Sequence, residues 1–84
     1  MNETAQNMMA ADVTLDTLGQ YCPMPIIFTA KKIKQMQVGQ LLLVLSSDPG
    51  VKKDMEAWCH NSGHDCLRIE VENGMYKCYV RKTR

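Results

Sequence analysis

The chain has 84 residues, of which 45% are hydrophobic and 23% charged, and its formal net charge is +1. This length accommodates one small domain, and the composition excludes intrinsically disordered and fibrous classes. The near-neutral charge also argues against a strong overall attraction to nucleic acid or to an anionic membrane.

The N-terminal segment lacks the pattern of an export signal. Residues 1–11 are polar and rich in methionine, so we expect a loose leader, followed by a single domain at residues 12–84. No basic start precedes an apolar run, and the longest such run, Leu41–Leu45, is too short to cross a membrane. We therefore expect a cytoplasmic protein with free thiols. Its cysteines are Cys22, Cys59, Cys66 and Cys78.

Two strands are predicted in the first half of the chain. Val13 and Leu15 alternate with polar neighbours, which is typical of a strand that ends before the break at Gly19. Leu41–Leu45 is apolar at every position, as expected of a strand in the middle of a sheet.

Between these strands, the spacing predicts an amphipathic helix from Pro23 to Met36. Cys22 is expected as its N-cap and Pro23 as its first residue, where the missing N–H costs nothing. The predicted apolar face consists of Ile26, Ile27, Ala30 and Ile33.

A second helix is predicted to start at Asp48-Pro49 and to end near Ser62. Asp48 is the expected N-cap, and Gly63 supplies the left-handed residue that commonly ends a helix. The predicted apolar face consists of Val51, Met55, Trp58 and Cys59.

The last quarter reads as a hairpin around Asn73-Gly74, a pair typical of tight turns. The inward side chains expected before the turn are Leu67, Ile69 and Val71, and those after it are Tyr76, Cys78 and Val80. This parity directs Cys66 outward, whereas Cys59 and Cys78 are expected to fill the core.

The predicted order is β-α-β-α-β-β. The first two strands are joined through a helix and should be parallel with a right-handed crossover, whereas the hairpin strands must be antiparallel. Each helix has one apolar face, so both should cover the same side of the sheet. The expected fold is an α+β two-layer sandwich of a four-stranded mixed sheet and two helices.

Cys22 is the candidate nucleophile, because a helix N-terminus favours the reactive thiolate. Pro23 and Pro25 stiffen the turn and leave the N–H groups of Met24 and Ile26 as donors near the sulfur. No Asp or His neighbours Cys22 in the sequence, so no general base is expected beside it. A small apolar cap residue is the alternative interpretation.

Several motifs together resemble those of the TusA/SirA-like sulfur-carrier family over residues 13–83. They include Leu15-Asp16, Gly19, Cys22-Pro23-Met24-Pro25, Lys31-Lys32, Gly39, Asp48-Pro49, Asp54, Trp58-Cys59, Gly63-His64 and Arg81-Lys82. The resemblance implies the two-layer fold and a sulfurtransferase in which Cys22 receives sulfane sulfur as a persulfide and relays it to another thiol.

The resemblance also implies partners and supporting residues. The donor would be a cysteine desulfurase or a rhodanese-like protein and the acceptor a protein thiol, with no metal or organic cofactor. The positioning residues would be Asp16, Gly19, Pro23, Met24 and Pro25, and the candidate docking residues Lys31, Lys32, Asp48 and Arg81. Thr17, Gln20, Tyr21 and Met24 differ from the tRNA-thiolation members, so tRNA thiolation is not assumed.

Three other functions agree less well with the sequence. Cys59, His60, His64 and Cys66 are zinc-ligand types, but their spacing matches no standard zinc site. The lysines resemble a solvated helix face more than a nucleic-acid surface, because interleaved aromatic residues are lacking. A thiol redox protein would need a resolving cysteine, and Pro25 takes that position. The main rival remains a regulatory, RNA-binding or protein-binding module in which Cys22 is structural.

Overall fold

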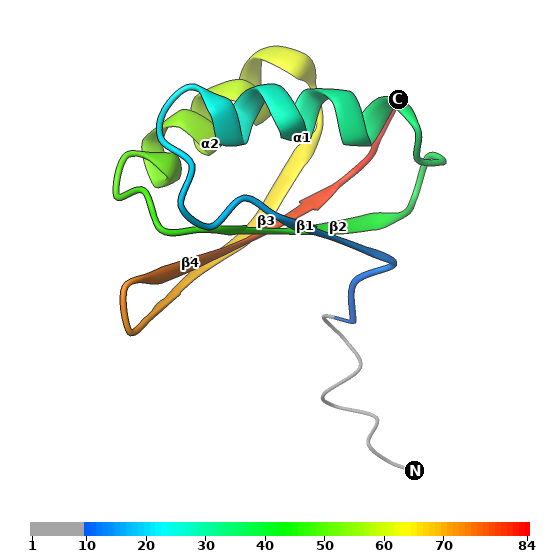
Figure 1. Cartoon of the computed structure of the whole chain (residues 1–84). Helices are drawn as coiled ribbons and strands as arrows, with labels where there is room; N and C mark the ends of the chain where they lie inside the picture. The colour runs from blue at the N-terminus through cyan, green and yellow to red at the C-terminus, as the bar shows by residue number, and fades with distance from the viewer. Residues whose placement is uncertain (1–9) are drawn as a thin grey trace, which may run out of the picture.

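The computed structural model of the protein describes residues 10–84 and has the predicted order of elements (Figure 1). The elements are β1 (Val13–Asp16), α1 (Met24–Lys34), β2 (Leu41–Ser46), α2 (Val51–Ser62), β3 (Asp65–Glu72) and β4 (Met75–Arg81). Both helices lie on one side of the four-stranded sheet, so the predicted α+β sandwich is confirmed. Most of the leader predicted at residues 1–11 lies outside the described residues.

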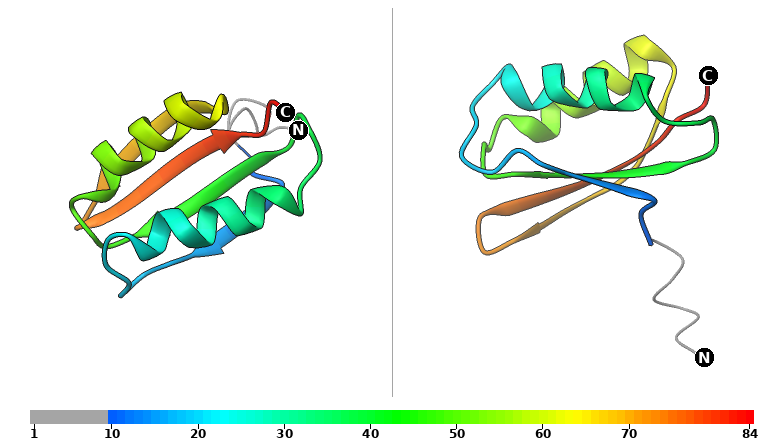
Figure 2. Two further views of the ribbon diagram at one scale, coloured as in Figure 1. Left: turned by 90° about the horizontal axis from the view of Figure 1, so that it is seen from above. Right: turned by 45° about the vertical axis from the view of Figure 1, so that its right-hand side comes forward.

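The strands are arranged in the order β1-β2-β4-β3. β1 and β2 are parallel, with Leu15 opposite Val44, and β4 is antiparallel to both β2 and β3. Seen from above the helices, α1 lies over the β1 side of the sheet and α2 over the β3 side (Figure 2). Because β1 and β2 are parallel, the loops that follow them lie at the same edge of the sheet.

The core lies between the sheet and the helices. Val51, Met55 and Cys59 of α2 are buried and Trp58 packs against them, as predicted. They meet Val44 and Val80 of the central strands, which are completely buried. Burying a side chain such as Met55 stabilises the fold by roughly 1.5–3 kcal/mol.

Helix α1 differs from its prediction in length and in its buried face. It ends at Lys34 rather than Met36, and Ile27 is exposed. Thr29 is buried instead, because its hydroxyl donates a hydrogen bond of 2.7 Å to the carbonyl oxygen of Pro25. A hydroxyl satisfied within its own helix can lie in the core without a large desolvation cost.

The hairpin forms at the predicted turn, but the first residues of β3 point to the opposite side from the one predicted. Asn73 and Gly74 have φ angles of 53° and 78°, as the tight turn requires. A β-bulge between Cys66 and Arg68 inserts Leu67 into the strand. Leu67 is therefore exposed and Cys66 packs against the core, the reverse of the predicted parity.

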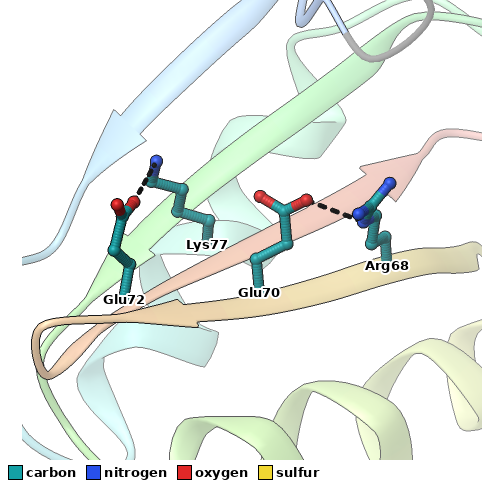
Figure 3. A network of polar contacts seen from close by, with 4 residues as sticks. All are labelled: Arg68, Glu70, Glu72 and Lys77. Atoms are coloured by element: carbon teal, nitrogen blue, oxygen red, sulfur yellow. Dashed lines mark hydrogen bonds and ion pairs between the residues drawn. The ribbon is translucent and has the colours of Figure 1, made fainter.

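The face of the sheet away from the helices carries ion pairs along β3 and β4 (Figure 3). Arg68 Nε lies 2.7 Å from Glu70 Oε2, and Lys77 Nζ lies 3.4 Å from Glu72 Oε1. In the part of the chain described, neither helix is long and apolar enough to cross a bilayer.

Candidate functional site

Cys22 lies exposed in the loop that joins β1 to α1. Its backbone N–H donates a hydrogen bond of 2.8 Å to Asp48 Oδ2. The prediction that Cys22 caps α1 is wrong: Pro23 is the N-cap, Met24 is the first helical residue, and no side chain caps the helix. The tertiary contact with Asp48 thus holds the Cys22 backbone in place.

The backbone amides expected to face the sulfur are already used. Met24 N–H donates to the carbonyl oxygen of Tyr21 at 2.8 Å, closing the turn that contains Cys22. Ile26 N–H donates to the carbonyl oxygen of Pro23 at 3.1 Å. The expectation that these two donors stabilise a Cys22 thiolate is therefore wrong.

Asp48 organises the loop between β2 and α2. Its Oδ1 accepts a hydrogen bond of 3.1 Å from Gly50 N–H, and its own N–H donates to Ser46 Oγ at 3.1 Å. It is not the N-cap that was predicted, because α2 starts at Val51 and Gly50 is the N-cap. Asp48 instead links the start of α2 to Cys22.

A second carboxylate, that of Asp54, lies near Cys22. A hydrogen bond to Asp54 is the main cause that raises the pKa of this thiol, followed by desolvation and by the charges of Asp54 and Asp48. The thiol is thus held in its protonated form, contrary to the thiolate expected at a helix N-terminus. It also has an acid–base neighbour, which the sequence did not predict.

Asp54 could have been found from the topology. It lies in the first turn of α2, and both loops that follow the parallel strands open at one edge of the sheet. The carboxylates of Asp48 and Asp54 both lie within 4 Å of the position that a Cβ on Gly50 would take. The two acids and Cys22 therefore form one cluster.

The predicted positioning residues shape the two loops of this cluster. Gly19 has a φ of 84° and donates its N–H to Ser47 Oγ at 2.9 Å, which ties the loops together. Asp16 Oδ1 accepts a hydrogen bond of 2.9 Å from Leu18 N–H. In the helix start, Pro25 is buried and Met24 half-buried, so the turn is anchored in the core.

The surroundings of Cys22 are open. Leu18, Tyr21 and Ile27 are exposed on the same loop and on the first turns of α1, and Tyr21 is 72% exposed. Lys31 is exposed further along α1, and Lys32 is half-buried.

Arg81, in contrast, is not brought to the site. It pairs with Leu41 at the start of β2, whereas the Cys22 cluster lies beyond the end of that strand. Of the other candidate docking residues, Lys31 and Lys32 lie on α1, the helix that begins at the site. Asp48 belongs to the Cys22 cluster itself.

Comparison with known families identifies the family of the chain. The family model described as "Sulfurtransferase TusA" matches residues 13–82. The chain belongs to the TusA family. It is thereby placed among sulfur-transfer proteins.

Three curated relatives of this TusA-family chain are each described as a "putative sulfur carrier protein". The Aquifex aeolicus protein is 39% identical over 72 residues, or 86% of this chain and 36% of that protein. YrkF of Bacillus subtilis is 39% identical over 75 residues, which are 89% of this chain and 40% of YrkF. YrkI of the same organism is 39% identical over 74 residues, which are 88% of this chain and 99% of YrkI. The chain thus spans less than half of the first two relatives and nearly all of YrkI.

A solved structure shows the same fold. The SirA-like protein of Desulfitobacterium hafniense superposes with a TM-score of 0.74 at 23% identity, over 86% of this chain and 99% of that one. This likeness supports the architecture described for the TusA-family domain.

The remaining cysteines and histidines lie elsewhere. His64 Nδ1 accepts a hydrogen bond of 3.2 Å from Thr83 N–H, and its ring lies 5.5 Å from that of Trp58, beyond the C-terminal end of α2. Cys59 and Cys78 are buried in the core as predicted. Within residues 10–84, no three His, Cys, Asp or Glu side chains are arranged to hold a metal ion.

Proposed function

We propose that this protein accepts a sulfane sulfur on Cys22 as a persulfide and relays it to a thiol of a partner protein. The single observation that carries the proposal is the exposed Cys22 thiol, fixed through its backbone by Asp48 and close enough to Asp54 for that carboxylate to raise the pKa of the thiol. Membership of the TusA family supports the general role in sulfur transfer.

In the loading step, the Cys22 sulfur attacks the outer sulfur of a donor persulfide. A new S–S bond forms to Cys22 while the donor S–S bond breaks, and the donor leaves as a thiolate that takes up a proton. In the unloading step, an acceptor thiolate attacks the outer sulfur of Cys22-S-SH. The S–S bond to Cys22 breaks, and the Cys22 thiolate regains its proton.

Asp54 accepts and returns the proton that is transferred in these two steps. The thiolate is the nucleophile, yet the carboxylates hold the resting thiol protonated. Asp54 is placed to accept the proton as the sulfur attacks and to return it when Cys22 leaves the persulfide. A protonated resting thiol also reacts less with stray oxidants, which suits a carrier that waits between partners.

Exposure of the site fits a relay between two proteins. Exposed Leu18, Tyr21 and Ile27 provide an apolar rim that a donor and an acceptor can cover in turn. We infer that the donor is a cysteine desulfurase or a rhodanese-like protein. A reducing compartment such as the cytoplasm would keep Cys22 free for loading.

The test is the intact mass of the protein after incubation with a cysteine desulfurase, pyridoxal phosphate and cysteine. We expect the wild type to gain one sulfur atom, which a reducing agent removes, and Cys22→Ser to gain none. Cys78→Ser is the matched control, because it removes a buried thiol and should still load.

Two outcomes would count against the relay. Sulfur retained by Cys22→Ser would place the site elsewhere. No gain by the wild type with either a desulfurase or a rhodanese-like donor would favour a binding module in which Cys22 is structural.

A further inference from the structure

A cavity of about 610 Å³ lies between α2 and β3, in a part of the molecule that sulfur transfer at Cys22 does not use. Its lining includes Cys59 on α2 and Cys66 on β3. Cys59 is 2% exposed, whereas Cys66 is only partly buried and is accessible from the cavity.

The β-bulge at the start of β3 creates this pair. Regular alternation would direct Cys66 to the opposite face of the sheet, but the extra residue Leu67 turns it toward the helices. There it packs against the core cluster that contains Cys59, and the two thiols are close enough to influence each other's pKa. Both thiols are free.

We propose that Cys59 and Cys66 form a second reactive site, a dithiol that low-molecular-weight disulfides oxidise to an intramolecular disulfide. The accessible Cys66 sulfur attacks a sulfur of the small disulfide, releasing one small thiol and leaving a mixed disulfide on Cys66. Cys59 then loses its proton and attacks the Cys66 sulfur, releasing the second small thiol. One small disulfide is reduced to two thiols as two cysteines are oxidised to one disulfide, so atoms and electrons balance.

Burial favours a disulfide over a bound metal ion at this place. A metal would need thiolates, whose charges are costly in a largely buried site, whereas a disulfide is as neutral as the two thiols that it replaces. The cation nearest to Cys66 is also paired, because Lys52 Nζ lies 3.2 Å from Glu56 Oε2.

The environment sets the pH dependence of the reaction. Burial raises the pKa of Cys66 above its ordinary value and that of Cys59 to about 12. Because the thiolate is the attacking species, oxidation should be slow at neutral pH and faster at pH 9.

The experiment uses the full chain carrying Cys22→Ser, so that sulfur carriage cannot interfere, and oxidised glutathione as the probe. We expect the intact mass to fall by two hydrogen atoms, faster at pH 9 than at pH 7. A non-reducing peptide map should link Cys59 to Cys66. Adding Cys59→Ala should instead trap one glutathione on Cys66, and adding Cys78→Ser should leave the internal disulfide unchanged.

The peptide map is also recorded for the wild type under the same conditions, so that the test does not depend on whether the variants fold. The wild-type map should show the same Cys59–Cys66 link beside any adduct on Cys22. A stable glutathione adduct on Cys66 with Cys59 still reduced would overturn the proposal. So would full reduction of both thiols after prolonged incubation at pH 9, or a link from either thiol to Cys78.

Discussion

The N–H of Cys22 donates a hydrogen bond of 2.8 Å to Asp48 Oδ2, and the other oxygen of the same carboxylate accepts from Gly50 N–H at 3.1 Å. One side chain thus fixes the loop that carries the thiol and the start of the helix that carries Asp54. We expect Asp48→Ala to lower the free energy of unfolding by about 2 kcal/mol, because two backbone donors lose a charged acceptor. The rate of sulfur loading should fall several-fold.

Asp48→Asn is the matched control, since its amide oxygen can still accept one of these hydrogen bonds. Its loss of stability, measured by urea unfolding, and its loss of loading rate should both be smaller than those of Asp48→Ala. Wild-type loading by Asp48→Ala would show that the bond does not position Cys22.

Replacing Asp54 should change the ionisation of Cys22 in a defined direction. The Asp54 carboxylate favours the protonated thiol by hydrogen bonding and by its charge, so Asp54→Asn should lower the pKa of Cys22. The rate of alkylation by iodoacetamide, followed at Cys22 by peptide mass, should then reach half its maximum at a lower pH. Sulfur loading should nevertheless become slower if Asp54 carries the proton.

Glu56→Gln is the control for this substitution, because it removes a carboxylate of the same helix that pairs with Lys52 rather than with Cys22. Its alkylation profile should coincide with that of the wild type. If the pH profile of Cys22 alkylation were unchanged in Asp54→Asn, Asp54 would have no acid–base role in the mechanism.

The fold depends on the buried face of α2, which includes Met55, the residue after Asp54. Met55 is completely buried, so Met55→Ala should lower the free energy of unfolding by about 2–5 kcal/mol. Lys53→Ala, on the exposed side of the same helix, should change it by less than about 0.5 kcal/mol. Urea unfolding followed by Trp58 fluorescence measures both, and similar values for the two variants would contradict the assigned core.

Much of this fold could be predicted from local patterns. The apolar face of α2, the Asn73-Gly74 turn and the parallel pairing of β1 with β2 each follow from spacing or from residue type. Ile27 and Cys66 were predicted on the wrong faces. An intrahelical hydrogen bond allows Thr29 to be buried on α1, and a bulge reverses the side on which Cys66 lies, so the apolar and polar alternation is overridden at both places.

The motif singled out Cys22 as the candidate nucleophile, but the chemical environment of its thiol was not evident from the sequence. Asp54 lies near Cys22 only because two loops, far apart in the chain, meet at one edge of the sheet. Because a helix N-terminus favours a thiolate, the sequence predicted a lowered pKa for Cys22. The two nearby carboxylates raise that pKa instead. Such a reversal depends on tertiary distances, which a one-dimensional pattern does not contain.

Lys31 offers a test of partner docking on α1. It is exposed on the helix that begins beside Cys22, where a basic side chain can meet an acidic rim on the sulfur donor. We expect Lys31→Glu to lower kcat/KM for sulfur transfer from the donor by about tenfold at low ionic strength, mainly through slower association. The difference from the wild type should shrink in high salt, because exposed charges are screened.

Lys53→Glu makes the same charge change on the exposed side of α2 and should leave kcat/KM for the donor nearly unchanged. Alkylation of Cys22 by a neutral reagent should be equal in both variants, since neither lysine contributes to the pKa shift of this thiol. A loss in Lys31→Glu that is independent of salt, or matched by Lys53→Glu, would mean that the donor does not recognise the basic last turn of α1 by charge. Docking would then depend on the apolar rim of Leu18, Tyr21 and Ile27.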